Sequence, residues 1–138
     1  MRALTNEERK GVEDGAREGF DAYVAAVNAL DADAWASFYS GASPVTAVAG
    51  ADVYGDKASW AKAVGGYFAQ RVSQRLIPKT VRVRALADGL ALLISEQAAA
   101  MTLRDGTAVS ALHVYTMLWK KEPDGWRIIH SHESWVDE

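Results

Sequence analysis

Apolar residues recur at steps of three and four through the first part of the chain, which is the spacing of one face of a helix. They are Val12, Ala16, Phe20, Tyr23, Val24 and Val27. The segment Thr5-Asn6-Glu7-Glu8 in front of them has the form of a capping box, in which Thr5 caps the helix and Glu8 reaches back. The pattern predicts a long amphipathic helix that lies on another layer of the protein.

Two shorter helices are predicted further along. Asp31 is placed to cap the first of them, which ends at Gly41 and Pro44, and Asp56 is placed to cap the other. Their aromatic and apolar residues are Trp35, Phe38 and Tyr39 in one and Trp60, Val64, Tyr67 and Phe68 in the other. The small and β-branched residues 45–53, interrupted by Gly50, predict a first pair of strands between these helices.

The period changes to an alternation of apolar and polar residues from Leu76 onward, which is typical of strands. The dipeptides Asp88-Gly89 and Asp105-Gly106 and the longer Glu122-Pro123-Asp124-Gly125 indicate hairpin turns. They separate four predicted long strands, at 76–87, 90–104, 107–121 and 126–136. Three helices followed by an antiparallel meander predict a single α+β domain over residues 1–138, with the helices on one face of the sheet.

Composition and charge exclude several classes of protein. The 138 residues carry 15 Lys and Arg against 18 Asp and Glu, so there is no basic excess to indicate a nucleic-acid partner. The absence of cysteine excludes disulfides, thiolate metal sites and a cysteine nucleophile. A polar beginning and the lack of a long apolar run predict a cytoplasmic protein with no membrane contact. No glycine-rich phosphate loop is present, so no organic cofactor is expected.

The turns also predict which side chains share a face of the sheet, because hairpins fix the pairing of strands. With a two-residue turn at Asp105-Gly106, Glu96 lies opposite Tyr115. With the next turn centred on Pro123-Asp124, Tyr115 lies opposite His132. One face then carries Leu92, Ile94, Glu96, His113, Tyr115, Met117, Trp119, Trp126, Ile128, His130, His132 and Ser134. Its apolar end is expected beneath the helices, and its polar end gathers all three histidines.

Glu96, Tyr115 and His132 form the main candidate for chemistry. A carboxylate inside an apolar cavity can orient an imidazole for general acid–base work, whereas the alternative is a buried polar cluster whose members only satisfy one another. The pair His130 and His132 has a spacing at which both side chains project together, so with Glu96 it could bind a metal or simply line the cavity. We assign no metal. Tyr23 either donates a hydrogen bond into the cavity or is a core tyrosine.

The opposite face of the last strands is expected to be too apolar to be fully solvated, which marks an interface. Its predicted residues are Leu93, Ser95, Gln97, Ala99, Met101, Ala108, Ser110, Leu112, Val114, Thr116, Leu118, Ile129 and Trp135. We therefore predict a homodimer through the outer face of the sheet.

The closing segment Gly125-Trp126-Arg127-Ile128-Ile129-His130-Ser131-His132-Glu133-Ser134, together with the order of elements, resembles the NTF2-like superfamily. Its SnoaL-like branch is the most similar, and the segment from Tyr23 to Trp35 resembles that family's junction of first and second helices. The ending is also similar to the kinase association domain of calcium/calmodulin-dependent kinase II. The resemblance covers nearly the whole chain and implies a cone with a mostly apolar pocket, used by isomerases, cyclases, hydrolases, dehydratases and non-catalytic dimerisation modules alike.

The resemblance carries over only some functional residues. Tyr23 matches the oxyanion tyrosine of ketosteroid isomerases, which belong to the superfamily. Their base is an aspartate on the first strand, where residues 45–49 here hold no carboxylate. Their second oxyanion group lies on the penultimate strand, where this chain has His113, Tyr115 or Thr116. The aspartate–arginine–aspartate set of the superfamily's epoxide hydrolases is not recognisable.

These observations lead to a specific hypothesis, an enzyme that isomerises, cyclises or dehydrates a small hydrophobic, carbonyl-bearing substrate without a cofactor. His132, oriented by Glu96, would move the proton, and Tyr23 and Tyr115 would hold developing negative charge. The residues expected to bind substrate are His130, His113, Ser134, Trp35, Trp60, Tyr67 and Met117. The competing hypothesis is a non-catalytic ligand-binding or dimerisation module that uses the same cavity.

Overall fold

The computed structural model describes residues 2–138 and contains three helices that begin where the sequence predicts. They are α1 (Asn6–Asn28), α2 (Ala32–Ser37) and α3 (Lys57–Ala69). The capping box of α1 is formed, because the Thr5 side chain accepts from the Glu8 backbone N–H and the Glu8 carboxylate accepts from the Thr5 N–H. Asp31 and Asp56 accept backbone N–H groups at the starts of α2 and α3. Each cap satisfies donors that a helix leaves free in its first turn.

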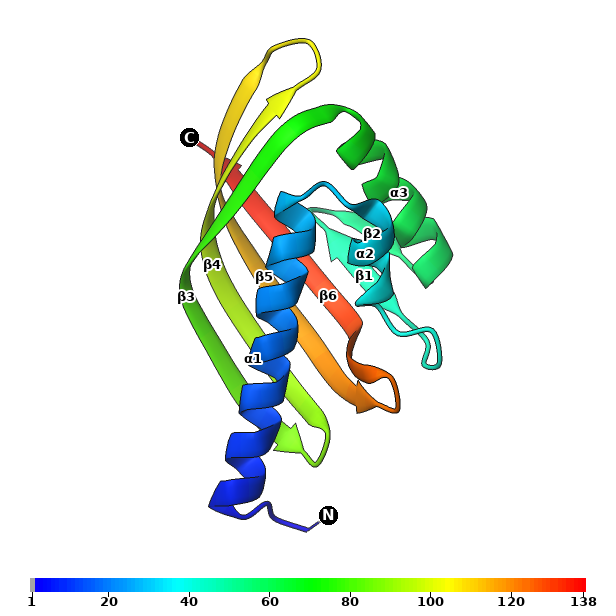
Figure 1. Ribbon diagram of the computed structural model, residues 1–138, viewed down its shortest axis with the longest axis vertical. Coiled ribbons are helices and arrows are strands. Elements are labelled where there is room, and N and C mark those ends of the chain that lie inside the picture. Colours follow the sequence, from blue (N-terminus) through cyan, green and yellow to red (C-terminus); the bar gives the residue numbers. More distant parts are fainter. Residues whose placement is uncertain (1) are drawn as a thin grey trace.

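Six strands form one curved, open sheet in the order β2-β1-β6-β5-β4-β3. The strands are β1 (Thr46–Ala49), β2 (Asp52–Tyr54), β3 (Arg71–Ala87), β4 (Leu90–Leu103), β5 (Ala108–Glu122) and β6 (Gly125–Asp137). The predicted meander of β3 to β6 is antiparallel, whereas β1 pairs in parallel with β6 and makes the sheet mixed. The α+β cone with helices on the concave side is confirmed (Figure 1).

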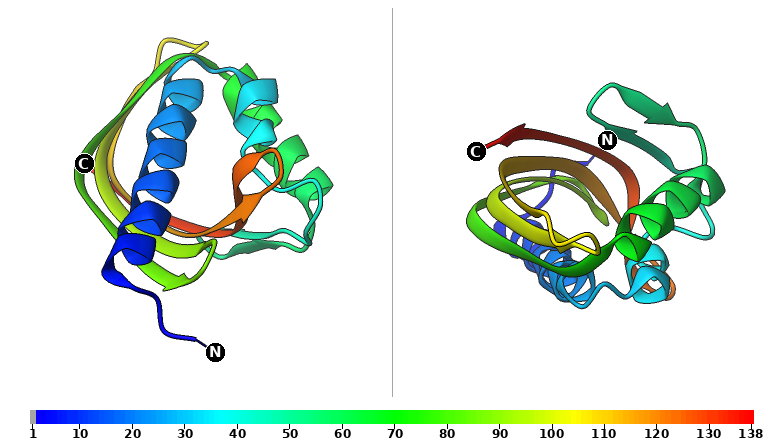
Figure 2. Two further views of the ribbon diagram at one scale, coloured as in Figure 1. Left: turned by 60° about the horizontal axis from the view of Figure 1, so that its bottom comes forward. Right: turned by 90° about the horizontal axis from the view of Figure 1, so that it is seen from above.

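Helix α1 lies along the concave face, and the sheet curves around it (Figure 2). Phe20, Trp119 and Ile128 are fully buried between the two layers and form the centre of the core. Helix α1 is held at its C-terminal end by a reciprocal pair of hydrogen bonds to β3. The Leu76 N–H donates to Asn28 Oδ1 (2.7 Å), and Asn28 Nδ2 donates to the Leu76 carbonyl (3.2 Å).

The predicted pairing of β4 with β5 is wrong by one residue. The Leu103 N–H donates to the Thr107 carbonyl (2.9 Å), so the turn has three residues, 104–106, and not two. Gly106 has a φ of +91°, a conformation that three-residue hairpins require near their end. Tyr115 consequently pairs with Ser95 instead of Glu96. Because side chains alternate along a strand, this one extra residue in the turn places the β4 residues that were predicted to face inward on the outer face of the sheet.

The pairing of β5 with β6 is correct at the turn and shifts further along. Trp119 pairs with Ile128 as predicted, but the next partners are Leu118 and His130, with Ile129 inserted as a β-bulge. Beyond the bulge Tyr115 pairs with Glu133, where the sequence predicted His132. Glu133 therefore takes the inward position, and His132 is exposed on the outer face.

The outer face of the sheet is partly apolar, with Ile94 38% and Leu112 48% exposed. Several residues expected on this face pack inward instead because of the register changes, namely Leu93, Ser95, Gln97, Ala99 and Trp135. The homodimer through this surface stays a prediction. Over residues 2–138, none of the helices has the length and apolar character needed to span a bilayer.

Two glycines let α1 approach the sheet closely. A Cβ atom at Gly19 would lie 2.8 Å from the ring of the buried Trp119, and one at Gly15 would collide with the indole of Trp126. A Cβ atom at Gly11 on the same helix would meet nothing within 4 Å. The first two glycines are therefore required by packing, whereas the third is not.

We expect Gly19→Ala to lower the free energy of unfolding by about 1–3 kcal/mol, because the added methyl group overpacks the contact with Trp119. Gly11→Ala is the matched control, and it should raise the free energy of unfolding by up to about 1 kcal/mol through helix propensity alone. Chemical denaturation of the two variants measures both values. Equal stabilisation by the two substitutions would contradict the packing argument.

Candidate active site

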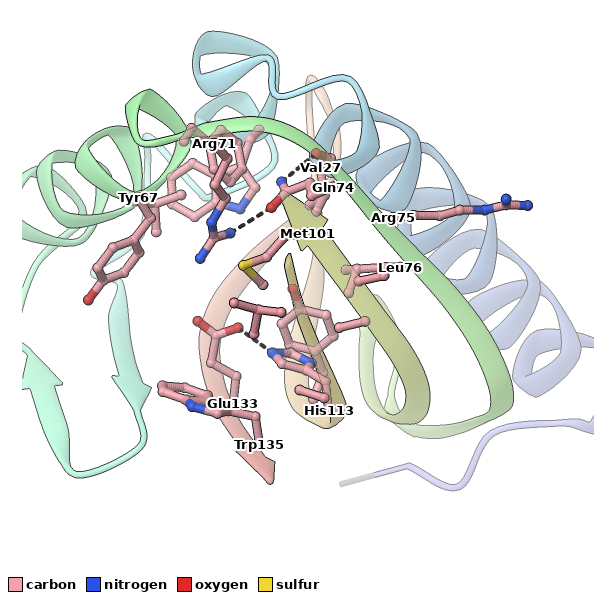
Figure 3. A pocket seen from close by; sticks show the side chains of 18 of the residues that line it. Val27, Tyr67, Arg71, Gln74, Arg75, Leu76, Met101, His113, Glu133 and Trp135 are labelled. Carbon is pink, nitrogen blue, oxygen red and sulfur yellow. Dashed lines mark hydrogen bonds and ion pairs between the residues drawn. The ribbon is translucent and has the colours of Figure 1, made fainter. Parts of the chain in front are cut away.

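A cavity of about 290 Å³ opens at the end of the cone where α1 stops and α3 faces the sheet. One wall is apolar and aromatic and includes Trp35, Trp60, Val64 and Phe68. Polar groups come mainly from the inner faces of β5 and β6 and the start of β3 (Figure 3). An apolar hollow with a few converging polar groups is the usual form of a small-molecule site.

Glu133 and His113 lie on neighbouring strands and form the charged centre of the cavity. His113 Nε2 lies 3.0 Å from Glu133 Oε2, and the two side chains are only 11% and 15% exposed. On its other side the His113 ring contacts Gln97, with 2.6 Å between Nδ1 and the amide nitrogen. The Gln97 carbonyl oxygen accepts from the Ser95 hydroxyl (2.6 Å). A chain of four polar side chains therefore fixes the imidazole.

This chain of contacts decides where the protons lie. The Gln97 amide nitrogen donates to Nδ1, which must then carry no proton, so the imidazole keeps its proton on Nε2 and donates it to Glu133. Both ring nitrogens are occupied. The second carboxylate oxygen of Glu133, Oε1, has no hydrogen-bond partner within residues 2–138. The group free to exchange a proton with a ligand is thus the carboxylate, and His113 holds it in place.

Two buried tyrosines form a second polar group beside this pair. Trp35 Nε1 donates to the Tyr23 hydroxyl (3.2 Å), and that hydroxyl donates to the Tyr115 oxygen (3.2 Å). The Tyr115 proton has no acceptor in the described part of the chain, although Tyr115 lines the cavity. Burial raises the pKa of both hydroxyls well above 10.0, so Tyr115 stays a neutral donor.

Arg71 contributes a positive charge at the mouth of the cavity. Its Nη1 donates to Gln74 Oε1 (2.6 Å), and Gln74 Nε2 donates to the Val27 carbonyl (2.6 Å) near the end of α1 (Figure 3). Burial lowers the pKa of Arg71, and the charge of Glu133 partly opposes this effect. Arg71 forms no ion pair with a carboxylate among the residues described.

The structure brings together six of the residues that the sequence selected. The cavity is lined by Tyr23, Tyr115, His113, Trp35, Trp60 and Tyr67. Met117 faces inward but is fully buried in the core and does not reach the cavity. Its expected contact with substrate is therefore corrected to a packing role.

The other predicted site residues lie on the outer face of the sheet, so the prediction that they point inward is corrected. Glu96 is exposed and accepts from Thr80 Oγ1 (2.8 Å) on the outside of the sheet. His130 Nδ1 lies 2.7 Å from the hydroxyl of Thr46, also outside. His132 and Ser134 are exposed and absent from the cavity. Glu96 and His132 thus form no pair, and within residues 2–138 no three His, Asp or Glu side chains lie together as potential metal ligands.

Sequence reasoning missed Glu133, Gln97 and Arg71. Glu133 directly follows His132, so the bulge at Ile129 alone decides which of the two side chains faces inward. The sequence holds a signal that Gln97, and not its neighbour Glu96, faces inward, because an amide is more easily buried than a carboxylate. Arg71 was overlooked because β3 starts five positions before the predicted beginning at Leu76.

The family model of the SnoaL-like domain matches residues 17–138. The chain therefore belongs to the SnoaL-like family, a branch of the NTF2-like superfamily. A comparison with curated proteins found no significant match.

Solved structures with the same fold have low sequence identity. A proposed scytalone dehydratase from Novosphingobium aromaticivorans is 7% identical with a TM-score of 0.85, over 96% of this chain and 89% of that one. A hexachlorocyclohexane dehydrochlorinase from Novosphingobium barchaimii is 10% identical with a TM-score of 0.78, over 97% and 94%. An NTF2-like superfamily protein from Salmonella enterica is 17% identical with a TM-score of 0.81, over 91% of each chain. The fold is thus shared with enzymes that act on small molecules.

Alkaline pH should destabilise the protein through its buried tyrosines. Burial raises the pKa values of Tyr23, Tyr39 and Tyr115 above 10.0, so above that pH these groups ionise in the unfolded chain while they stay protonated in the folded one. Unfolding then releases protons, and stability falls by about 1.4 kcal/mol per pH unit for each group. Tyr115→Phe should make the slope shallower by about that amount. Urea denaturation between pH 9 and 11 measures it, and an unchanged slope would contradict the assignment.

Proposed function

We propose that the protein is a small-molecule enzyme that uses general acid–base catalysis on a hydrophobic, carbonyl-bearing substrate in this cavity. The reaction would be of the isomerase, cyclase or dehydratase type. One observation carries the proposal. The Glu133 carboxylate is fixed through one oxygen by His113, and within residues 2–138 its other oxygen has no partner, in a cavity that also holds the Tyr115 hydroxyl, whose proton has no acceptor among these residues.

Glu133 has the role of base in the proposed chemistry. Its free Oε1 would take a proton from the carbon next to the substrate carbonyl, and the electron pair of that C–H bond would move onto the carbonyl oxygen. The Tyr115 hydroxyl would donate a hydrogen bond to this oxygen as negative charge develops there. The products of this step are an enolate and a protonated Glu133. All three reaction types would share this first step.

The second step would distinguish the reaction types. Return of the proton to a different carbon isomerises the substrate. In a dehydration the enolate electron pair expels a hydroxyl group from the adjoining carbon, and the proton on Glu133 leaves with it as water. In a cyclisation the enolate carbon attacks a second carbonyl of the same molecule, whose oxygen then receives the proton. The cavity contacts favour none of these over the others.

His113 and Tyr23 are positioning residues in this proposal. His113 would hold the carboxylate through its Nε2 proton, while Gln97 fixes the tautomer that makes this possible. Tyr23 accepts from Trp35 and donates to Tyr115, so it leaves the Tyr115 proton for the substrate. The proposal keeps a carboxylate beside an imidazole, but the carboxylate would now move the proton and the imidazole would orient it.

We expect the protein to catalyse exchange of the α-hydrogens of 2-tetralone, a two-ring ketone, in deuterated water. Glu133→Gln should lower the exchange rate by about 100-fold or more, because an amide cannot accept the proton. Tyr115→Phe should lower it by about 100-fold through loss of the donor to the enolate oxygen. Proton NMR measures the exchange.

His132→Gln is the matched control, since it changes an exposed residue beside Glu133 on the opposite face of β6. Its exchange rate should equal that of the unmodified protein. Saturable binding of 2-tetralone without exchange, or equal rates for Glu133→Gln and the unmodified protein, would exclude the catalytic proposal and favour the ligand-binding module.

A further inference from the structure

We propose that the cavity recognises a substrate with a carboxylate group, which binds to Arg71 while its hydrophobic body lies against the aromatic wall. This inference rests on the proposed function for the use of the cavity and adds the chemical class of the molecule. The substrate would then carry a carboxylate in addition to the carbonyl group that the proposed function requires. Two features of Arg71 and one of the cavity wall support this proposal.

The first feature is the way Arg71 is held. Gln74 accepts a hydrogen bond from one end of the guanidinium and is itself anchored to the backbone of α1 at the Val27 carbonyl. The remaining N–H groups have no hydrogen-bond partner within residues 2–138. In Figure 3 the other end of the guanidinium points into the space that Glu133 and His113 border. A planar fork that is fixed from behind and open in front is suited to a carboxylate.

The second feature is the missing counter-ion. Arg71 is half-buried, and a charge withdrawn from water is normally paired. Two carboxylates, Glu133 and Asp137, line the cavity, but Glu133 is hydrogen-bonded to His113, and within residues 2–138 neither forms an ion pair with Arg71. Opposite charges thus stand apart in the same cavity. A ligand carboxylate at Arg71 would provide the missing partner and leave Glu133 free.

The third feature is the apolar wall that faces these groups. Trp35, Trp60 and Phe68 are almost fully buried and line the same cavity, whose volume of about 290 Å³ suits a small ring system. Tyr67 lies next to Arg71, with the guanidinium carbon 5.8 Å from its ring centre. A molecule with an aromatic or alicyclic body and one acidic group would satisfy both sides.

Arg75 offers a matched comparison for Arg71. It lies four residues further along β3 and borders the cavity, but it is exposed and its guanidinium points away from the cavity in Figure 3. Replacing either arginine by glutamine removes the same charge from the same strand. Only the substitution at Arg71 removes the proposed contact.

The test measures binding of 2-naphthoate and of its neutral analogue 2-naphthamide by calorimetry at neutral pH. The unmodified protein should bind the acid more tightly than the amide. Arg71→Gln should weaken binding of the acid by about 10- to 100-fold and change binding of the amide by less than about twofold. Arg71→Lys should fall between, because it keeps the charge and loses the fork. Arg75→Gln should bind both probes like the unmodified protein.

Glu133→Gln gives an expectation of opposite sign. Removing the negative charge from the cavity should strengthen binding of the acid several-fold and leave the amide unchanged. The inference would be overturned if the unmodified protein bound both probes equally well or bound neither. It would also be overturned if Arg75→Gln lowered the affinity for the acid as much as Arg71→Gln does. Because these are binding measurements, they are separate from the exchange of 2-tetralone, so either proposal can fail while the other stands.

Discussion

The close contact between α1 and the concave face of the sheet determines the rest of the structure. Gly15 and Gly19 bring the helix backbone against the indoles of Trp126 and Trp119, and this half of the cone is filled with side chains such as Phe20, Trp119 and Ile128. Helix α1 then ends at Asn28, which is bonded to β3, while the strands continue beyond it. The cavity lies where the sheet extends past its helix. The cavity is therefore lined by the last turns of α1, by α2 and α3, and by the strands that continue past α1.

Polar groups in such a space must satisfy one another, because water is partly excluded and unpaired polar atoms are costly. Ser95, Gln97, His113 and Glu133 do so in a single chain of hydrogen bonds. The chain ends at a carboxylate with one oxygen free, just as the Trp35–Tyr23–Tyr115 chain ends at a free hydroxyl proton. The first chain therefore ends in an unpaired acceptor, Glu133 Oε1, and the second in an unpaired donor, the Tyr115 hydroxyl.

Much of the fold could be predicted from the sequence, because capping residues, helical spacing and turn dipeptides act over a few residues. Thr5, Asp31 and Asp56 cap the helices as expected, and the turn at Pro123-Asp124 pairs Glu122 with Gly125. The candidate site could be predicted only in part. The inward face of the selected residues on α1, α2, α3 and β5 was predicted correctly, since it follows from helical period or from aromatic residues in the strand, although Met117 lies in the core and not at the cavity. Those on β4 and β6 depend on register, which an extra turn residue or a bulge changes for every following position.

The bulge at Ile129 also determines what chemistry the cavity can offer. Without it, the alternation from Ile128 would turn His130 and His132 inward and leave Glu133 outside. The cavity would then hold several imidazoles and no carboxylate from β6. With the bulge, a single carboxylate reaches the imidazole of His113 on the neighbouring strand, and the two further histidines pair outside or meet solvent. Because of this one inserted residue, the cavity holds a fixed pair of a carboxylate and an imidazole instead of three histidine side chains. Arg71 lines the same cavity, and within residues 2–138 its positive charge forms no ion pair with this carboxylate.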